Sequence, residues 1–297
     1  MEIKVIVLGS SGSAPTKERA LPCVALIYNG ELFLFDCGEG TQMQMLRYGV
    51  NASRLKAVFL SHAHADHMLG IAGLVRSLAL SGRKDPLDIC IPKGYENAVK
   101  TLASFDKAMI GYQIRIHGVG NGIAYRARDF SVSSFALKHT IPTCGYIFRE
   151  RDRLRFNKEK SHGLGIKGTM FSELEKKGSI RIGRKVIRIG AVTKLQRGKA
   201  VVYAADTRPV KSVARIAKGA DLLIHESSYA DEHRHLAAER MHSSASDVAR
   251  IAKTAGVKQL ILTHISARYK SAEGIEKSAR KVFGNTVVAD DGYSVTV

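Results

Sequence analysis

The segment SHAHADHM, residues 61–68, constrains this chain more than any other feature of its sequence. Three imidazoles and one carboxylate fall within six positions, in the order His-x-His-x-Asp-His. A protein core disfavours four neighbouring polar side chains, because each would need its own hydrogen-bond partner. A metal site uses all four as ligands. The segment therefore indicates a metal centre.

The run before this segment, LKAVFL at residues 55–60, predicts a buried strand, so the histidines follow directly from a strand end. Side chains two apart on an extended chain point the same way, and His62 and His64 can therefore bind one metal ion. Asp66 and His67 come where the chain turns into the next helix, and they can reach a second ion. Nitrogen and carboxylate ligands without cysteine suit zinc, with manganese or iron as alternatives.

Three further polar residues follow apolar runs: His139 after SSFALK, Asp206 at the end of KAVVYAAD, and His264 at the end of QLILTH. Taken singly, each also fits a capping or core residue. The end of a strand is nevertheless a usual place for functional side chains in α/β folds. We therefore expect one metal ion at His62, His64 and His139, a second at Asp66, His67 and His264, and Asp206 as the ligand that bridges them.

Short apolar runs alternate with amphipathic ones along most of the chain. The predicted strands are 3–9, 24–30, 31–38, 55–60, 130–137, 146–150, 199–206, 221–227 and 259–266, and the predicted helices are 40–49, 71–83 and 246–256. Two similar halves of this kind predict a mixed α/β fold with two sheets to cover. His233 and His235 lie two apart in a further predicted helix, so they face different ways, and we expect both to be solvated.

The charge of the chain favours a polyanionic partner. The formal net charge is +19 over 297 residues, and such a balance promotes contacts with phosphates. A cell in which every protein is basic is the alternative explanation. Residues 149–188 alone hold thirteen Lys or Arg against five acidic residues, with five glycines and no proline. This segment predicts an inserted basic arm, and the alternative is a solvated loop without a partner.

Cellular location is constrained by the cysteines and by the apolar runs. Cys23, Cys37, Cys90 and Cys144 form no CxxC pair, so we expect buried or half-buried thiols in a reducing cytoplasm. No apolar run reaches the roughly 18 residues of a membrane helix, and no membrane span is expected. The N-terminal apolar run is too short for a secretory signal and predicts a strand that ends in a turn.

Several motifs together resemble known proteins. SHAHADH resembles the signature of the metallo-β-lactamase fold, an αββα sandwich with a dinuclear metal site between its halves. More specific segments resemble the ribonuclease Z family, and they occur in the expected order along nearly the whole chain. They are GSAPTKER near the N-terminus, FDCGEGTQMQMLR at 35–47, HTIPTCGY around His139, ADTRP around Asp206, HES at 225–227, MHSS at 241–244 and HISARY around His264.

The resemblance implies a fold, an activity and partners. The fold would be a single metallo-β-lactamase domain over residues 1–297, α/β, with two mixed sheets flanked by helices and the arm 149–188 inserted as a tRNA-binding exosite. The activity would be a zinc-dependent endoribonuclease in the cytoplasm that uses two zinc ions. It would remove the 3′ trailer from precursor tRNA, leaving a 3′-OH on the tRNA and a 5′-phosphate on the trailer. A homodimer without membrane attachment is implied as well.

The resemblance also implies roles for individual residues. Asp66 would bind metal and help orient or deprotonate the attacking water, while His242, held by Glu226, would protonate the leaving oxygen. Arg268 would neutralise charge on the phosphoryl oxygens. The RNA contacts of the arm would include Lys167, Lys176 and Lys177. One departure from the family concerns docking: its arm commonly carries a Gly-Pro element, and GLGIKGTM stands here instead.

Two other functions stay open at this point. A small-molecule or cyclic-nucleotide phosphodiesterase of the same fold would keep the metal ligands but would have no need of a basic arm. A nucleic-acid-binding protein with a relic site is a second possibility, and the presence of all seven proposed ligands argues against it.

Overall fold

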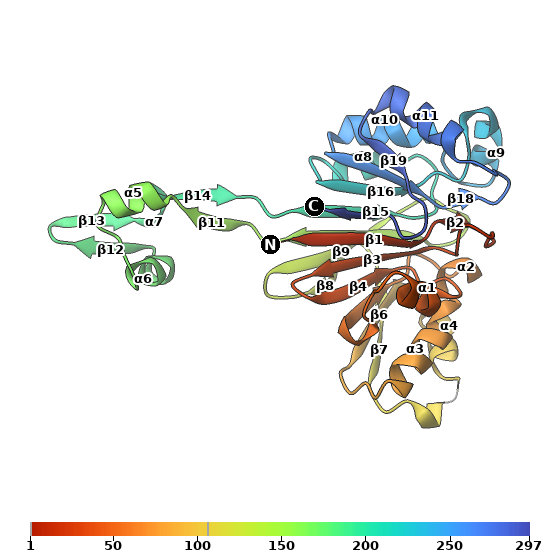
Figure 1. Ribbon diagram of the computed structural model, residues 1–297, viewed down its shortest axis with the longest axis horizontal. Helices are drawn as coiled ribbons and strands as arrows, with labels where there is room; N and C mark the ends of the chain where they lie inside the picture. The colour runs from red at the N-terminus through yellow and green to blue at the C-terminus, as the bar shows by residue number, and fades with distance from the viewer. Residues whose placement is uncertain (1, 106) are drawn as a thin grey trace. The chain divides into compact units, whose positions relative to one another are not determined.

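The computed structural model describes residues 2–105 and 107–297. The chain forms two compact units (Figure 1). Unit 1 comprises Met1–Arg149 with Ala200–Val297, and unit 2 comprises Glu150–Lys199. The predicted insertion 149–188 thus lies in unit 2 except for Arg149, and unit 2 extends eleven residues beyond it.

Unit 1 contains two large sheets. The first has the strand order β20 (Ser294–Thr296), β1 (Ile3–Gly9), β3 (Cys23–Tyr28), β4 (Glu31–Phe35), β5 (Leu55–Phe59), β6 (Leu87–Pro92) and β7 (Ile114–Val119). The second has the order β19 (Thr286–Val288), β17 (Gln259–Thr263), β16 (Leu222–Glu226), β15 (Ala200–Ala204), β10 (Cys144–Glu150), β9 (Phe130–Ala136) and β8 (Gly122–Arg126). A short parallel pair joins β2 (Ser11–Gly12) to β18 (Ile265–Ser266).

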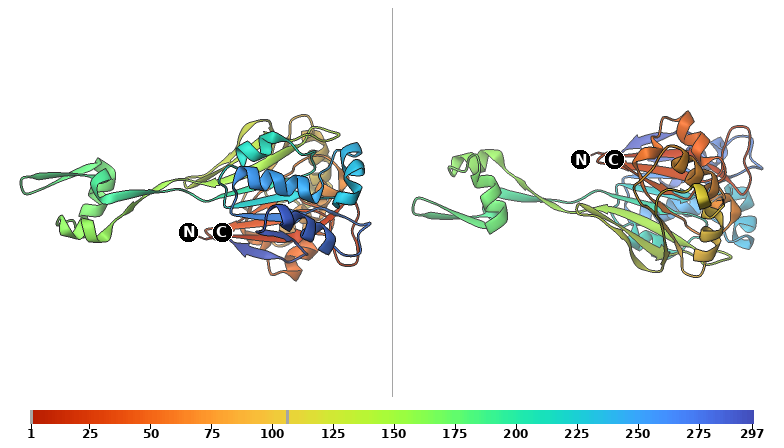
Figure 2. Two further views of the ribbon diagram at one scale, coloured as in Figure 1. Left: turned by 90° about the horizontal axis from the view of Figure 1, so that it is seen from above. Right: turned by 90° about the horizontal axis from the view of Figure 1, so that it is seen from below.

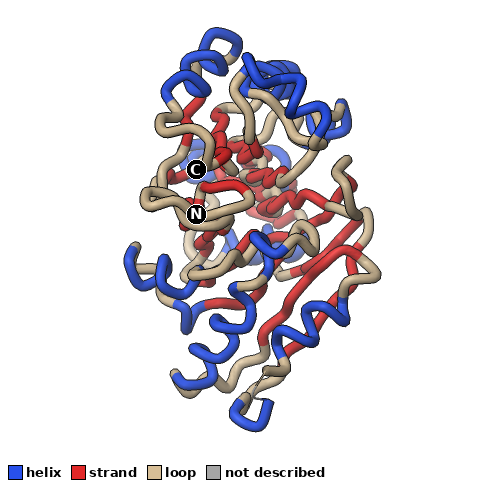
Figure 3. The backbone as a smooth tube through the Cα atoms, turned by 90° about the vertical axis from the view of Figure 1, so that its right-hand side faces the viewer, coloured by secondary structure: helices blue, strands red, loops and turns tan. Residues whose placement is uncertain are grey.

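Helices flank both sheets. On the side of the first sheet lie α1 (Thr41–Arg47), η1 (Ala52–Arg54), α2 (Ala65–Met68), α3 (Gly70–Leu80), α4 (Glu96–Ala103) and η2 (Lys107–Met109). On the side of the second lie α8 (Lys211–Ile216), η3 (Asp231–His233), α9 (Arg234–Glu239), α10 (Ala245–Ala255) and α11 (Glu273–Val282). Seen from above and below, the blue and the orange helices cover opposite faces of unit 1 (Figure 2). Figure 3 shows the strands between the two groups of helices.

The four layers, two sheets between two groups of helices, follow from the way that side chains alternate between the two faces of each strand. Along β1, Ile3, Val5 and Val7 join the core between the two sheets, whereas Ile6 and Leu8 join the core under α1 and α3. A strand buried on both faces must be apolar at every position, and IKVIVLG nearly is. A third core packs the second sheet against α8, α10 and α11. The predicted mixed α/β sandwich with helices on both sides is confirmed.

The predicted elements are present, with ends that differ by a few residues. The boundary between the first two predicted strands after β1 is a two-residue turn at Asn29 and Gly30, both with positive φ (51° and 79°). Asn-Gly is the sequence that such a hairpin turn favours.

Among the described residues, no helix has the length and apolar character that a membrane crossing needs.

The topology brings several strand ends to one edge of unit 1. Strands β15, β16 and β17 run parallel, so the residues after their carboxyl ends emerge together. Asp206, Glu226 and His264 lie at or just beyond these three ends. The loops after β5 and β9 add the segment 61–67 and His139.

Unit 2 has its own small core. It consists of the ribbon β11 (Arg153–Phe156) with β14 (Thr193–Gln196), the hairpin β12 (Ser179–Ile182) with β13 (Lys185–Arg188), and the helices α5 (Lys158–Gly163), α6 (Met170–Lys177) and α7 (Ile189–Val192). Its buried apolar side chains are Ile166, Leu174, Ile180, Ile187 and Val192. The segment is therefore folded within itself, which a solvated loop would not be.

Candidate active site

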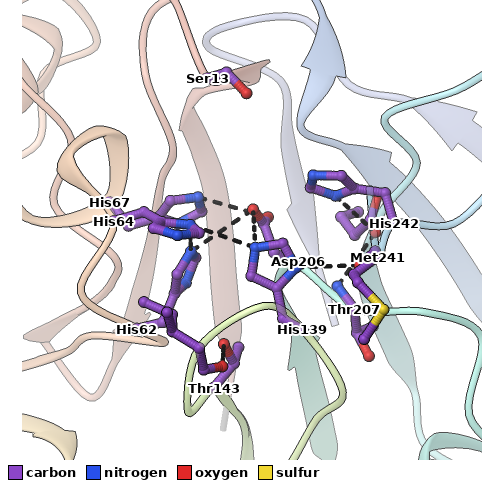
Figure 4. Close-up of polar contacts among 12 residues, drawn as sticks. Ser13, His62, His64, His67, His139, Thr143, Asp206, Thr207, Met241 and His242 are labelled. Atoms are coloured by element: carbon purple, nitrogen blue, oxygen red, sulfur yellow. Dashed lines mark hydrogen bonds and ion pairs between the residues drawn. The ribbon is translucent and has the colours of Figure 1, made fainter. Parts of the chain in front are cut away.

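All seven candidate metal ligands meet in one cluster. Figure 4 labels five of them, His62, His64, His67, His139 and Asp206. The first predicted set, His62, His64 and His139, is joined through the His64 ring: its Nδ1 lies 2.9 Å from His62 Nε2 and 3.3 Å from His139 Nε2. In the second predicted set, His67 Nε2 lies 3.2 Å from His264 Nε2, and Asp66 Oδ2 lies 3.4 Å from His67 Nε2. Within each set, one donor atom per residue lies within 4.8 Å of the others. The predicted division into two sets agrees with this geometry.

Asp206 lies between the two sets. Its Oδ2 is 3.7 Å from both His62 Nε2 and His139 Nε2. Its Oδ1 is 3.2 Å from His264 Nε2 and 3.5 Å from His67 Nε2. The two oxygens of one carboxylate thus face one set each, which is the arrangement expected of a bridging ligand.

The donor atoms fit divalent metal ions. The cluster supplies five imidazoles and two carboxylates and no thiolate, a set that suits zinc and also other first-row metals. Asp206 Oδ1 is buried without any hydrogen-bond partner in the described structure. A buried carboxylate oxygen left in this state is costly unless a cation satisfies it. The residues present therefore fit a bound cation.

Protonation differs among the candidate ligands. Burial would lower the pKa of His67, but the charges of Asp206 and Asp36 outweigh it and raise that pKa well above its usual range. Burial lowers the pKa of His62, His64 and His139, so their rings carry a free lone pair at neutral pH. Burial alone would raise the pKa of Asp206, but the nearby His264 and His67 outweigh it and hold that pKa well below its usual range. Asp206 is therefore ionised.

Asp36 orients His67 from behind. Its buried carboxylate accepts hydrogen bonds from Ser61 N (2.7 Å), Tyr203 Oη (2.6 Å) and His67 Nδ1 (2.8 Å). Held in this way through Nδ1, the His67 ring presents Nε2 to Asp206 and the cluster. Sequence reasoning missed this residue. The signal was present, because Asp36 ends the apolar run ELFLFD as Asp206 ends KAVVYAAD.

The loop after β1 closes against the cluster. Ser13 N–H donates to Asp66 Oδ2 at 2.9 Å. A Cβ added at Gly12 would lie 2.6 Å from His264 Nδ1, so only glycine fits there. Arg19 fastens the far side of the loop by donating to Ser10 Oγ (2.7 Å) and Ala289 O (2.6 Å). The loop is thus a structural support for Asp66.

Unusual backbone conformations gather at the cluster. Five described residues other than glycine have positive φ, and four of them are Ser13, Asp36, Met241 and His264. Such conformations cost free energy in L-residues and persist where surrounding contacts hold them. His264 is itself a predicted ligand. Ser13 contacts the predicted ligand Asp66, and Asp36 contacts His67. Met241 O lies 3.1 Å from His139 Nδ1. The strain thus coincides with the site.

Glu226 and His242 form the predicted pair beside the cluster. Glu226 Oε1 lies 3.3 Å from His242 Nδ1, and the same carboxylate is buried and accepts Ser243 N–H at 2.8 Å. Burial lowers the pKa of His242, but the charge and hydrogen bond of Glu226 outweigh it and raise that pKa to about 9. The His242 ring centre lies 5.0 Å from that of His139 and 5.5 Å from that of His264. A histidine whose raised pKa favours the protonated form therefore borders the cluster of candidate ligands.

His242 also has a second geometric option. With Asp206 and His264 it forms a further group of possible metal ligands, which sequence reasoning did not foresee.

Ser228 connects this pair to the candidate metal ligand His264. Its Oγ lies 2.9 Å from Glu226 Oε2, 2.8 Å from His264 Nδ1 and 3.2 Å from His242 Nδ1. This residue was also missed, because nothing in the letters HESSY separates Ser228 from Ser227.

The predicted RNA-contacting residues lie in both units. Arg268, in unit 1, is exposed and its guanidinium lies 4.8 Å from the ring centre of Tyr229. Lys167, Lys176 and Lys177 lie in unit 2 and are exposed, and Lys177 pairs with Glu173 at 2.7 Å.

Of the two histidines expected to be solvated, His235 is exposed, but His233 is half-buried and 2.8 Å from Tyr269 Oη. That expectation was wrong for His233, because its 3₁₀ turn packs against the loop that carries Tyr269.

Family models match both parts of the chain. Residues 3–154 match the model described as anti-Pycsar protein Apyc1, and residues 151–265 match the model described as the beta-lactamase superfamily domain.

Solved structures show the fold. The chain resembles human tRNase Z, short form, with a TM-score of 0.73 and 23% identity over 98% of both chains. It also resembles the metallo-beta-lactamase fold protein YhfI from Bacillus subtilis, with a TM-score of 0.72 and 21% identity over the whole of both chains. The metallo-β-lactamase fold that the motifs predicted is thereby confirmed.

Curated sequences give the family. A protein named Ribonuclease Z from Methanothermobacter thermautotrophicus is 41% identical over 99% of this chain and 97% of its own length. A similarity of that extent, over both units and every motif of the site, shows that the chain belongs to the ribonuclease Z family, with the metallo-β-lactamase fold.

Proposed function

We propose that this protein is a metal-dependent endoribonuclease that removes the 3′ trailer from precursor tRNA. The observation that carries the proposal is the near-full-length similarity to a ribonuclease Z. The products would be a tRNA that ends in a 3′-OH and a trailer with a 5′-phosphate. We further propose the seven clustered residues as ligands of two divalent cations, with zinc as the expected metal and manganese or iron as alternatives.

The bound cations would supply an activated water and charge stabilisation on the phosphoryl oxygens. The residues of the chain do the rest. Asp66, fixed by Ser13 N–H, orients the attacking water and takes its proton. The water oxygen bonds to phosphorus as the P–O3′ bond breaks. His242, charged and held by Glu226, donates a proton to the departing O3′. Arg268, exposed beside Tyr229, pairs with a phosphoryl oxygen.

Unit 2 is the proposed tRNA-binding arm. It holds fifteen Lys or Arg against five acidic residues, a net charge of +10 over fifty residues. Most of these cations are exposed, so they are available to phosphates. Lys167, Lys176 and Lys177 are the proposed contacts. A small-molecule or cyclic-nucleotide phosphodiesterase would have no use for such a charge, and this disfavours that alternative.

A homodimer is the proposed assembly. Helices α1 and α3 touch where Gln42 lies against Gly73, and they expose Met43, Leu46 and Leu80 by 64%, 76% and 70%. Large apolar side chains exposed together often mark a protein interface. A second copy of the chain is the proposed occupant. Analytical ultracentrifugation should show a dimer for wild type and a monomer for Leu46→Glu. If wild type is a monomer at micromolar concentration, the proposed homodimer is refuted.

A cytoplasmic location is proposed on the cysteines. All four are free and buried, which agrees with a reducing compartment.

The proposed activity has a direct test. Metal-loaded protein is incubated with a 3′-extended precursor tRNA, and the ends of both products are analysed. A single cut that leaves a 3′-OH, lost in Asp66→Ala, is the expected result. Turnover of a generic phosphodiester without any cut in precursor tRNA would overturn the proposal in favour of a small-molecule enzyme.

A further inference from the structure

A basic pocket opens beside His242. It is a cavity of about 620 Å³ in unit 1, and its walls come from the loops after β9 and β15 and from α8, α9 and α10. Its charged lining residues are Lys138, Arg208, Lys211, Arg234 and Asp247, with His242 on the same wall. In Figure 4, His242 lies on the opposite side of Asp206 from His62, His64 and His67.

The charge in this pocket is not balanced by the protein. Arg234 makes a two-pronged pair with Asp247 (2.9 and 2.6 Å). The same carboxylate also accepts from Arg250 (2.8 Å) and Ser244 Oγ (2.9 Å), so it has no capacity left for other cations. The remaining cations of the wall, Lys138, Arg208 and Lys211, make no side-chain hydrogen bond or ion pair with any described residue. An anionic ligand would satisfy them.

The backbone ties two of these cations to the metal cluster. Lys138 directly precedes the candidate ligand His139, and Arg208 comes two residues after Asp206. Arg208 N–H donates to Lys138 O at 2.9 Å, and Lys138 N–H donates to Thr207 Oγ1 at 3.0 Å. The backbone of Lys138 and Arg208 is therefore fixed relative to the cluster.

We propose that Lys138, Arg208 and Lys211 form a phosphate-binding subsite for the RNA strand on the 5′ side of the cut. The proposal rests on the proposed function and deepens it. In that reaction His242 protonates O3′, and O3′ belongs to the last nucleotide of the mature tRNA. The nucleotide that carries O3′ thus lies on the His242 side of the cluster. The pocket beyond His242 receives the backbone phosphates of the mature strand, and the trailer leaves on the other side.

The experiment compares two triple variants of equal charge. The test variant is Lys138→Ala, Arg208→Ala and Lys211→Ala. The control is Lys4→Ala, Arg128→Ala and Lys253→Ala, three exposed cations outside the pocket wall. Matching thermal midpoints and metal content with wild type establish that both variants are folded. Steady-state kinetics then use precursor tRNA over a range of salt concentrations, with two competing inhibitors: mature tRNA without a trailer, and the 5′-phosphorylated trailer alone.

The test variant should raise KM for precursor tRNA by roughly 10- to 100-fold and reduce the slope of log affinity against log salt by about two to three. It should weaken inhibition by mature tRNA by a similar factor and leave inhibition by the trailer unchanged. An effect no larger than that of the control variant would overturn the subsite. Weaker inhibition by the trailer in place of mature tRNA would overturn its direction.

The proposed function fails separately. If wild-type protein does not cut precursor tRNA, the function is wrong, whatever the variants do. Direct binding of mature tRNA to wild type and to the test variant, followed by fluorescence anisotropy, still decides whether these cations hold phosphates. Equal affinity of the two proteins for mature tRNA would then refute the subsite as well.

Discussion

Ser228 Oγ lies 2.8 Å from His264 Nδ1, the ring nitrogen that faces away from the cluster of candidate metal ligands. The hydroxyl has one proton, and the carboxylate of Glu226, 2.9 Å away, can only accept it. The oxygen of Ser228 is then left to accept the proton of His264 Nδ1. This fixes the ring so that Nε2, 3.2 Å from Asp206 Oδ1, is the nitrogen presented to a metal ion.

Ser228→Ala should therefore weaken metal binding by about 10- to 100-fold, the usual effect of losing a hydrogen bond behind a ligand. Metal affinity is measured by competition with a chromophoric chelator. Ser227→Ala is the matched control. Ser227 is the adjacent residue, and its Oγ is buried without a hydrogen-bond partner in the described structure. Ser228→Thr, which keeps the hydroxyl, should restore affinity. Equal losses in both alanine variants would show that Ser228 only fills space.

Most of the cluster could be predicted from the sequence, because its members follow strand ends. The contacts that support those residues could not be predicted. His139, Asp206 and His264 each follow an apolar run. A polar residue in that position can be recognised from the sequence alone. Ser13 supports Asp66 from 53 residues away, and Ser228 supports His264 from 36 residues away. Their roles arise from tertiary folding, and serine is common in ordinary turns.

The extent of the basic segment was also only partly predictable. The five residues after Arg188 carry no charge, and this gap set the expected end. The structure continues to Lys199, because β14 must return along the chain to pair with β11, from Arg153 opposite Gln196 to Phe156 opposite Thr193. Lys194, Arg197 and Lys199 lie beyond the gap and belong to the same unit.

His242 is proposed to protonate a poor leaving group, and this makes its effect dependent on the substrate. His242→Asn should lower kcat for precursor tRNA by about 10²- to 10⁴-fold, the range of a general acid. A p-nitrophenyl phosphodiester, whose leaving group departs without a proton, should lose far less. Parallel kinetics on both substrates check this. Equal losses on both would assign His242 a part in metal binding, the second option that its position beside Asp206 and His264 allows.

Asp231 gives a stability effect that depends on pH. Burial raises its pKa, but hydrogen bonds from Ser246 outweigh it, and the folded pKa lies below its usual value. The unfolded chain therefore binds more protons at acid pH. The stabilisation is complete above the unfolded pKa of about 3.9 and is lost as pH falls through the folded pKa.

Asp231→Asn keeps an acceptor and removes the charge, so the comparison isolates this contribution. The variant should be less stable than wild type by at most about 1 kcal/mol near pH 7, since the site is half exposed. The difference should shrink below about pH 4. Urea unfolding of metal-free protein at several pH values measures it, and a difference that stays constant from neutral to acid pH would contradict the account.

Unit 2 can be removed at a point where the chain passes close to itself. Glu150 N–H donates to Lys199 O at 2.9 Å, so a short glycine linker can replace residues 151–198. The deletion should raise KM for precursor tRNA by about 10²-fold or more and flatten the salt dependence, because it removes many phosphate contacts. A deletion variant that binds precursor tRNA as tightly as wild type would remove the case for unit 2 as the arm.

The number of bound metal ions can be measured from stability. A ligand that binds only the folded state adds RT ln(1 + [L]/Kd) to the free energy of unfolding. Above saturation, each bound ion therefore contributes about 1.4 kcal/mol for every tenfold rise in free metal, and two ions about 2.7 kcal/mol. Because Asp206 faces both ligand sets and its Oδ1 is otherwise unpaired, we expect the slope for two ions. Chemical unfolding in metal buffers provides the slope. His139→Ala, which removes a ligand from one set only, should reduce it to the value for one ion, and a wild-type slope of one ion would refute the dinuclear centre.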